Sequence, residues 1–110
     1  MGKVIGKDLH EAICKELTEL YIRKNHDYGD SFHKSFQDFG EVMCAIRMTD
    51  KLNRFVALIG KEQMVNDESL EDTVKDLANY AIMTLMEMRR ERETHENAMI
   101  GQGTDNNIKE

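Results

Sequence analysis

Three cationic side chains in the middle of the chain recur at helical spacing and could bind phosphate groups. Lys51 stands four residues after Arg47 and three before Arg54, so one face of a helix would present all three. Arginine forks and a lysine ammonium both match phosphate oxygens, which suits a polyanionic ligand. Asp50 lies on the same face. The simpler interpretation is therefore a solvated face on which Asp50 pairs with both arginines.

A second polar stripe, mostly acidic, follows further along the chain. Its members also recur at helical spacing: Glu68, Asp72, Asp76 and Asn79. Like charges one helical turn apart repel each other by about 0.2–0.5 kcal/mol per pair. A helix N-terminus would favour the first two acids, but Asp76 and Asn79 lie too far along for that explanation. Mg²⁺ would explain them, since it takes oxygen ligands. Pairing with the basic stripe across a helical bundle would explain them equally well.

The stretch KNHDYGDSF, residues 24–32, gathers polar side chains around one glycine. Taken alone, it predicts a turn between two helices, with Gly29 in a left-handed conformation. Together with the two stripes, it predicts one rim of a ligand pocket. Tyr28 would stack on a base, Lys24 would contact phosphate and Asn25 would contact base or ribose. His26 or Asp27 could act as a general base.

The elements that must position these residues are all predicted to be helices. The chain of 110 residues has no proline, and its apolar residues recur every three or four positions. We expect helices over 8–25, 31–40, 41–59 and 67–94. They would form one domain, residues 1–94, followed by a disordered tail over 95–110. The predicted fold is all-α, a small antiparallel bundle of three main helices and one short one. A bundle this small gains core by forming a homodimer or a higher homo-oligomer.

Sequence patterns also predict the helix ends and the buried faces. Asp8 is expected to cap the first helix, with Glu11 completing a capping box, and Gly40 and Gly60 to end later ones. The apolar stripes predict the core positions. These are Leu9, Ile13, Leu17, Leu20 and Tyr21; Phe32, Phe36 and Phe39; Val42, Ala45, Ile46, Leu52, Val56 and Ile59; and Leu70, Val74, Leu77, Ala81, Leu85 and Met88.

Composition excludes several classes of function. A net charge of −6 argues against binding long nucleic acids, which favours a basic surface. No apolar run approaches the roughly 20 residues of a membrane span, and no membrane partner is expected. Cys14 and Cys44 fit no zinc or redox motif and are expected to be reduced, partly buried thiols. We expect a cytoplasmic protein, located in the host cytoplasm if a phage encodes it.

Three motifs in this order, KNHDYGDSF, RMTDKLNRF and DESLEDTVKDLANYAIM, resemble the nucleotide modification associated domain 1 family (DUF1599) of phages and bacteria. The resemblance covers residues 8–90. It implies an all-helical domain linked to nucleotide metabolism and akin to the MazG-like nucleotide pyrophosphohydrolases. The family's polar positions fall on Lys24, His26, Asp27, Tyr28, Arg47, Asp50, Lys51, Arg54, Glu68, Asp72, Asp76 and Asn79.

MazG-like enzymes bind magnesium through an ExxE motif on one helix and an ExxD motif on a later one. Here ELTE, from Glu16 to Glu19, is an ExxE, and ESLE, from Glu68 to Glu71, is the nearest later partner. The gap between them is longer than in those enzymes, and the second motif ends in Glu instead of Asp. The four-carboxylate cage is therefore not plainly present. Its absence weakens the case for hydrolysis more than the case for nucleotide binding.

The sequence supports three functions. The first is a Mg²⁺-dependent nucleoside triphosphate pyrophosphohydrolase, with Mg²⁺ on Asp50, Glu68, Asp72 and Asp76. Its catalytic residues would be Asp27, His26 and Asp76, and its substrate-binding residues Lys24, Asn25, Tyr28, Arg47, Lys51, Arg54 and Asn79. The second is a non-catalytic protein that sequesters a signalling nucleotide, cyclic or derived from ADP-ribose. The third is a structural or protein-binding bundle whose stripes are salt bridges.

Overall fold

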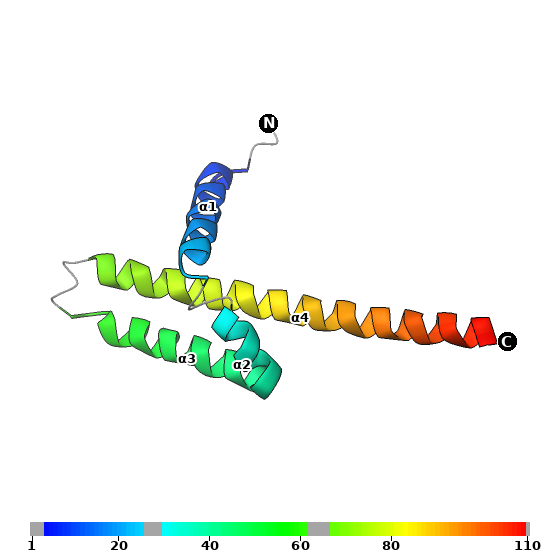
Figure 1. Ribbon diagram of the computed structural model, residues 1–110. Coiled ribbons are helices and arrows are strands. Elements are labelled where there is room, and N and C mark those ends of the chain that lie inside the picture. Colours follow the sequence, from blue (N-terminus) through cyan, green and yellow to red (C-terminus); the bar gives the residue numbers. More distant parts are fainter. Residues whose placement is uncertain (1–3, 26–29, 62–66, 110) are drawn as a thin grey trace.

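The computed structural model describes residues 4–25, 30–61 and 67–109, and the side chains of residues 4–25, 30–61 and 70–100. Within these ranges the fold is all-helical, as predicted. The helices are α1 (Lys7–Arg23), α2 (Ser31–Phe39), α3 (Glu41–Leu58) and α4 (Asp67–Lys109). Three of them are long and α2 is short (Figure 1). The predicted left-handed Gly29 lies outside the described residues.

Glycines set three of the helix ends. Gly40, with φ of 71°, ends α2 and begins α3, and Gly60, with φ of 84°, follows the end of α3. Both agree with the sequence. The predicted cap at Asp8 is wrong, because the N-cap of α1 is Gly6, with φ of 89° and no side-chain hydrogen bond. Glu11 instead pairs with Lys7 at 3.1 Å, which leaves no capping box.

The long helices are not arranged as one compact bundle. α3 and α4 run antiparallel and pack along the whole length of α3, whereas α1 crosses α4 steeply and projects away from it (Figure 1). α2 lies beside the N-terminal end of α3, where it reaches both α3 and α4. The antiparallel α3–α4 hairpin is therefore the part of the fold that brings the two polar stripes to the same place.

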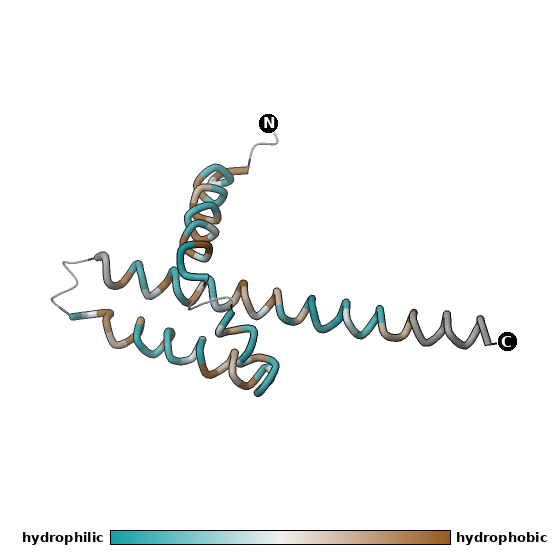
Figure 2. Tube along the Cα trace, viewed as in Figure 1, coloured by the Kyte–Doolittle hydropathy of each residue, from teal (hydrophilic) through white to brown (hydrophobic). Residues whose placement is uncertain are grey.

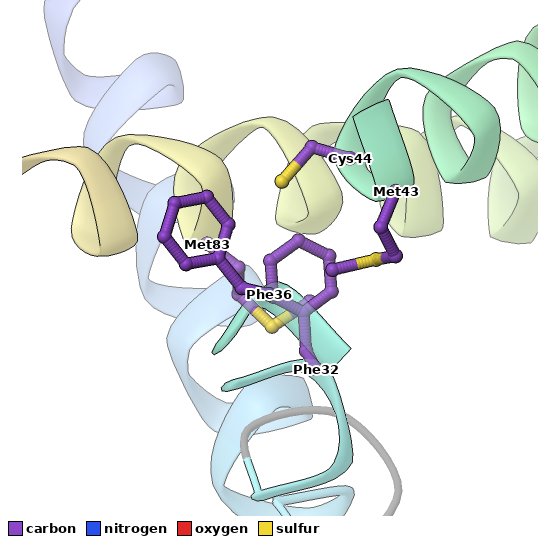
Figure 3. Packing of buried hydrophobic residues seen from close by; sticks show 5 residues of the cluster. All are labelled: Phe32, Phe36, Met43, Cys44 and Met83. Carbon is purple, nitrogen blue, oxygen red and sulfur yellow. The ribbon is translucent and has the colours of Figure 1, made fainter. Parts of the chain in front are cut away.

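The core lies where α2, α3 and α4 meet. It consists of two phenylalanines from α2, two sulfur-containing residues from α3 and one methionine from α4: Phe32, Phe36, Met43, Cys44 and Met83 (Figure 3). Leu20 and Tyr21 of α1 pack against its edge. Flexible methionine side chains suit this irregular junction, since they fill gaps that branched residues cannot. Two of the three predicted phenylalanines are buried, but Phe39 is exposed.

Most of the predicted core stripes are wrong, because they face away from these contacts. On α3 all six predicted residues are exposed, from Val42 at 68% to Leu52 at 49%. On α4 Leu70 and Leu77 are half-buried, while Val74, Ala81, Leu85 and Met88 are exposed. On α1 Leu17 is buried, but Leu9 and Ile13 are exposed. Hydrophobic positions recur along α1, α3 and α4 far beyond the small core (Figure 2).

α4 continues well past the predicted end near Thr94, as far as Lys109. No proline interrupts this segment, so nothing in the backbone stops the helix. Both cysteines are free thiols, as expected; Cys44 is buried, but Cys14 is exposed instead of partly buried. No helix in the described ranges combines the length and the hydropathy that crossing a bilayer would require.

Candidate functional site

The two polar stripes meet at one ion pair. Lys51 of α3 places its Nζ 3.0 Å from Oδ2 of Asp76 on α4, and both side chains are mostly buried. The same ammonium lies 6.0 Å from the ring centroid of Tyr80, one turn further along α4. Tyr80 in turn stacks on Phe32 of α2, with ring centroids 5.8 Å apart. We call Arg47, Lys51, Arg54, Asp76 and Tyr80 the charged seam.

The rest of the basic stripe borders this pair. Arg47 and Arg54 are exposed, and neither forms an ion pair within the described part of the chain. Asp50 is also exposed and does not bridge the two arginines there, so the simple charge-balanced face expected for α3 does not form. Since Lys51 turns toward α4, the arginines lie one turn before it and nearly one turn after it, along the edge of the seam.

Asn79, the last member of the acidic stripe, makes a contact with α1 instead of α3. Its side chain is 2% exposed, and Nδ2 donates a hydrogen bond of 3.2 Å to the backbone carbonyl of Leu17 in α1. Asn79 therefore holds α1 on α4 and does not point toward Lys51. Asp72 is exposed. The side chain of Glu68 lies outside the described residues.

The predicted rim of the pocket is described only at its ends. Lys24 and Asn25 are exposed just after α1, and Asn25 Nδ2 lies 3.4 Å from Oδ1 of Asp30. His26, Asp27 and Tyr28 lie outside the described residues. A shallow groove of about 530 Å³ opens beside this segment, lined by Tyr21, Asn25, Asp30, His33 and Arg90.

One member of each acidic motif meets a common lysine. Lys75 donates to Glu71 on α4 at 3.3 Å and to Glu16 on α1 at 3.4 Å. The hydrogen bonds to Glu71 and Glu16 raise the pKa of Lys75 above its ordinary value of 10.5. Glu16 thus reaches Lys75 of α4, while its own side chain stays half-exposed.

A polar clamp between α2 and α4 was missed by the sequence analysis. Nδ1 of His33 lies 2.8 Å from Oε1 of Glu87, and Arg90 donates to Oε2 of the same carboxylate at 2.8 Å. Glu87 is only 3% exposed. The clamp borders a groove of about 620 Å³ that also reaches Gln37, Glu91 and His95. The available signal was a lone glutamate inside the apolar stretch MTLMEM.

The predicted Mg²⁺ ligands are not assembled within the described residues. Among those side chains, no group of three or more His, Cys, Asp or Glu converges in a way that could hold a metal ion. Asp76 already pairs with Lys51, and Asp50 lies on the neighbouring helix without joining it. The described donors therefore do not fit a magnesium site by themselves, and no chemical step is assigned to one.

The fold and this site define an all-helical domain whose central hairpin carries a charged seam, and the two arginines of the seam form no ion pair with the side chains that the structure describes. The chain belongs to the nucleotide modification associated domain 1 family, whose model matches residues 24–88, from the predicted turn through α4 to Met88. The family description associates the chain with nucleotides. The match contains the whole charged seam and the His33–Glu87 contact. No curated protein and no solved structure matches the chain.

Proposed function

We propose that the chain binds a nucleotide through its phosphates at the charged seam. The observation that supports this proposal most is the row of cations on α3. Lys51 is fixed by Asp76, and the flanking Arg47 and Arg54 have no acidic partner in the described structure. In a chain with a net charge of −6, acids to pair with arginines are plentiful. Two arginines without an acidic partner among the described residues, beside a half-buried lysine, therefore suit an anionic ligand.

The spacing of these cations fits a short polyphosphate. From Arg47 to Arg54 the helix rises about 10 Å, with Lys51 between them. This span is comparable to an extended triphosphate. The arginines can each bind two phosphate oxygens in a fork, while the ammonium acts as a point charge. Asp76 holds Lys51 in place and keeps the seam from becoming uniformly basic, which would favour long nucleic acids.

Aromatic residues support a position for the base near α2. Tyr80 lies next to Lys51 and stacks on Phe32. Phe32 belongs to the first turn of α2, which follows the polar segment 24–30 directly. We therefore propose that Lys24, Asn25 and Tyr28 contact the base or the sugar. The family description agrees with a nucleotide ligand of this kind.

The bound nucleotide would have one of two fates. In the first, a phosphoanhydride is hydrolysed, as the resemblance to MazG-like enzymes implies; His26 or Asp27 would then be the general base, and Mg²⁺ would supply charge stabilisation. In the second, the nucleotide is sequestered intact. Binding is the part of the proposal that the described residues support, because it requires the cations and an aromatic surface but no assembled metal site.

One experiment tests binding and separates the two fates. The protein is incubated with a panel of canonical and signalling nucleotides, with and without Mg²⁺, and free nucleotide is quantified by mass-detected chromatography before and after heat denaturation. New products indicate hydrolysis, whereas depletion followed by full recovery indicates sequestration. If no nucleotide of the panel is depleted or converted, the proposal fails.

A further inference from the structure

An apolar face of the α3–α4 hairpin is uncovered. On α3 it comprises exposed residues along the whole helix: Val42, Ala45, Leu52, Val56 and Ile59. On α4 it comprises Val74, Ala81, Leu85 and Met88, which are exposed, and Leu70 and Leu77, which are half-buried. Apart from Ile46, these are the residues of α3 and α4 that the sequence predicts as core. A surface patch this long and continuous marks an interaction site in a soluble protein.

Helical geometry places both stripes on the same side of the hairpin. In α3 the line facing α4 passes through Cys44 and Lys51, and in α4 the facing line passes through Asp76 and Met83. Most of each apolar stripe is displaced from its facing line by roughly a third of a turn, in the same rotational sense, whereas Leu85 lies about half a turn from the facing line of α4. Because the two helices are antiparallel, equal displacements lead to one common face.

The opposite side of the hairpin is already occupied. α1 is held there through Asn79 and Lys75, which are displaced from the facing line of α4 in the other rotational sense. α1 therefore cannot cover the apolar face by packing more closely on the hairpin. The natural occupant of that face must come from outside this hairpin.

The chain exposes more area than a compact monomer of its mass. The chain exposes 8666 Å², whereas a compact monomer of 12.8 kDa exposes about 6300 Å². The radius of gyration is 19.2 Å, against about 13 Å for a compact domain of this length. The projecting end of α4 accounts for part of this excess. The excess still leaves ample area for an interface, which needs only about 800 Å² from each partner.

The character of the face favours a second copy of this chain. Between the apolar residues the face carries uncharged positions, Thr49, Asn53 and Thr84, so two copies can approach without like charges meeting. A membrane-binding face would instead carry lysines and arginines along its border. Ala45 and Ala81 leave room for close helix packing. Two identical hairpins also match in length, and face to face they complete a four-helix bundle.

We propose that a second copy of this chain covers the apolar face, so that two α3–α4 hairpins form a four-helix bundle with α1 on the outside of each. This inference does not depend on the proposed nucleotide binding. The charged seam lies along the line where α3 faces α4, and α1 lies on the side away from the partner, so each copy keeps its own seam.

The test is the mass of the full chain in solution, measured by light scattering after size exclusion and by sedimentation at several concentrations. The wild-type chain is expected at twice the mass of 12.8 kDa. Leu52→Glu and Met88→Glu each bury a charge in the interface and should weaken self-association more than about 100-fold. Ile22→Glu, which changes an exposed apolar residue on α1, is the matched control and should leave the mass unchanged.

Each outcome bears on the proposal. A larger oligomer that the Leu52 and Met88 variants dissociate and the Ile22 variant does not would also support it, since the same face would be covered. If the variants lose helicity, the thermal unfolding midpoint of the wild type tests the proposal instead. For an obligate dimer this midpoint must rise with protein concentration. A wild-type chain that stays monomeric at about 100 μM, binds neutral vesicles, or associates regardless of these substitutions would overturn the proposal.

Discussion

His33 and Glu87 are separated by 54 positions in the chain, yet Nδ1 of His33 lies 2.8 Å from one oxygen of the Glu87 carboxylate and 3.0 Å from the other. An ionised carboxylate only accepts hydrogen bonds, so Nδ1 must bear the hydrogen. The contact joins α2 to α4 beside the core, and Arg90 completes the set of donors around the buried carboxylate.

Removal of the Glu87 charge should therefore destabilise the fold. We expect Glu87→Gln to cost about 1–3 kcal/mol, because one buried acceptor of two charge-assisted hydrogen bonds is weakened. Glu91→Gln, at an exposed position one turn later, should change the free energy of unfolding by less than about 0.5 kcal/mol. Urea unfolding measures both. Equal midpoints for the two variants would mean that the clamp contributes nothing.

The charged seam predicts a loss of nucleotide affinity with little change in fold. For the nucleotide that the panel identifies, Lys51→Ala and Arg54→Ala should each raise Kd about tenfold or more, because each removes a charge-assisted contact to phosphate. Lys34→Ala and Arg89→Ala change exposed cations elsewhere and serve as matched controls. Isothermal titration measures all four. Unchanged binding in both seam variants would place the phosphates elsewhere.

The attachment of α1 should depend more on a buried amide than on a surface ion pair. Asn79→Ala removes the hydrogen bond to the Leu17 carbonyl and should cost about 1–2 kcal/mol; the cost is moderate because that carbonyl keeps its intrahelical partner. Glu16→Gln breaks one half-exposed pair with Lys75 and should cost less than about 1 kcal/mol. Hydrogen exchange in α1 measures both, and the reverse order would contradict the assignment.

Alkaline pH should loosen the same junction. The carboxylates of Glu71 and Glu16 raise the pKa of Lys75 in the folded state, so its stabilising contribution is complete below the unfolded pKa of 10.5. It is then lost as the pH rises through the higher, folded-state pKa. The difference in unfolding free energy between the wild type and Lys75→Met should therefore shrink above pH 10.5. A difference that stays constant to pH 12 would contradict this.

Local signals in the sequence were sufficient for the helices and for part of the seam. Gly40 and Gly60 mark helix ends because their positive φ suits glycine, and helical spacing alone placed Lys51 and Asp76 on polar stripes that could meet. The sequence could not indicate which surface covers each apolar face. An apolar stripe indicates that a surface will be covered, but not whether this chain or another copy covers it, so Val56 and Leu85 were expected in the wrong core.

Long-range polar contacts could not be predicted from the sequence either. Nothing local relates His33 to Glu87, and a helical wheel cannot tell that Asn79 turns toward α1 while Asp76, three residues earlier, turns toward α3. These assignments depend on the steep crossing of α1 and on the place of α2. The place of α2 follows from the packing of Phe32 and Phe36 against α3 and α4.

The unequal exposure of the two thiols makes the natural chain suitable for labelling with a single dye. Cys44 is sealed in the core, whereas Cys14 is open to reagents halfway along α1. A maleimide fluorophore would therefore attach to α1 alone, without any engineered cysteine. Because α1 leans away from the hairpin, the anisotropy of that dye would follow the swing of this one helix, and its change on adding a nucleotide could be recorded in real time (Figure 1).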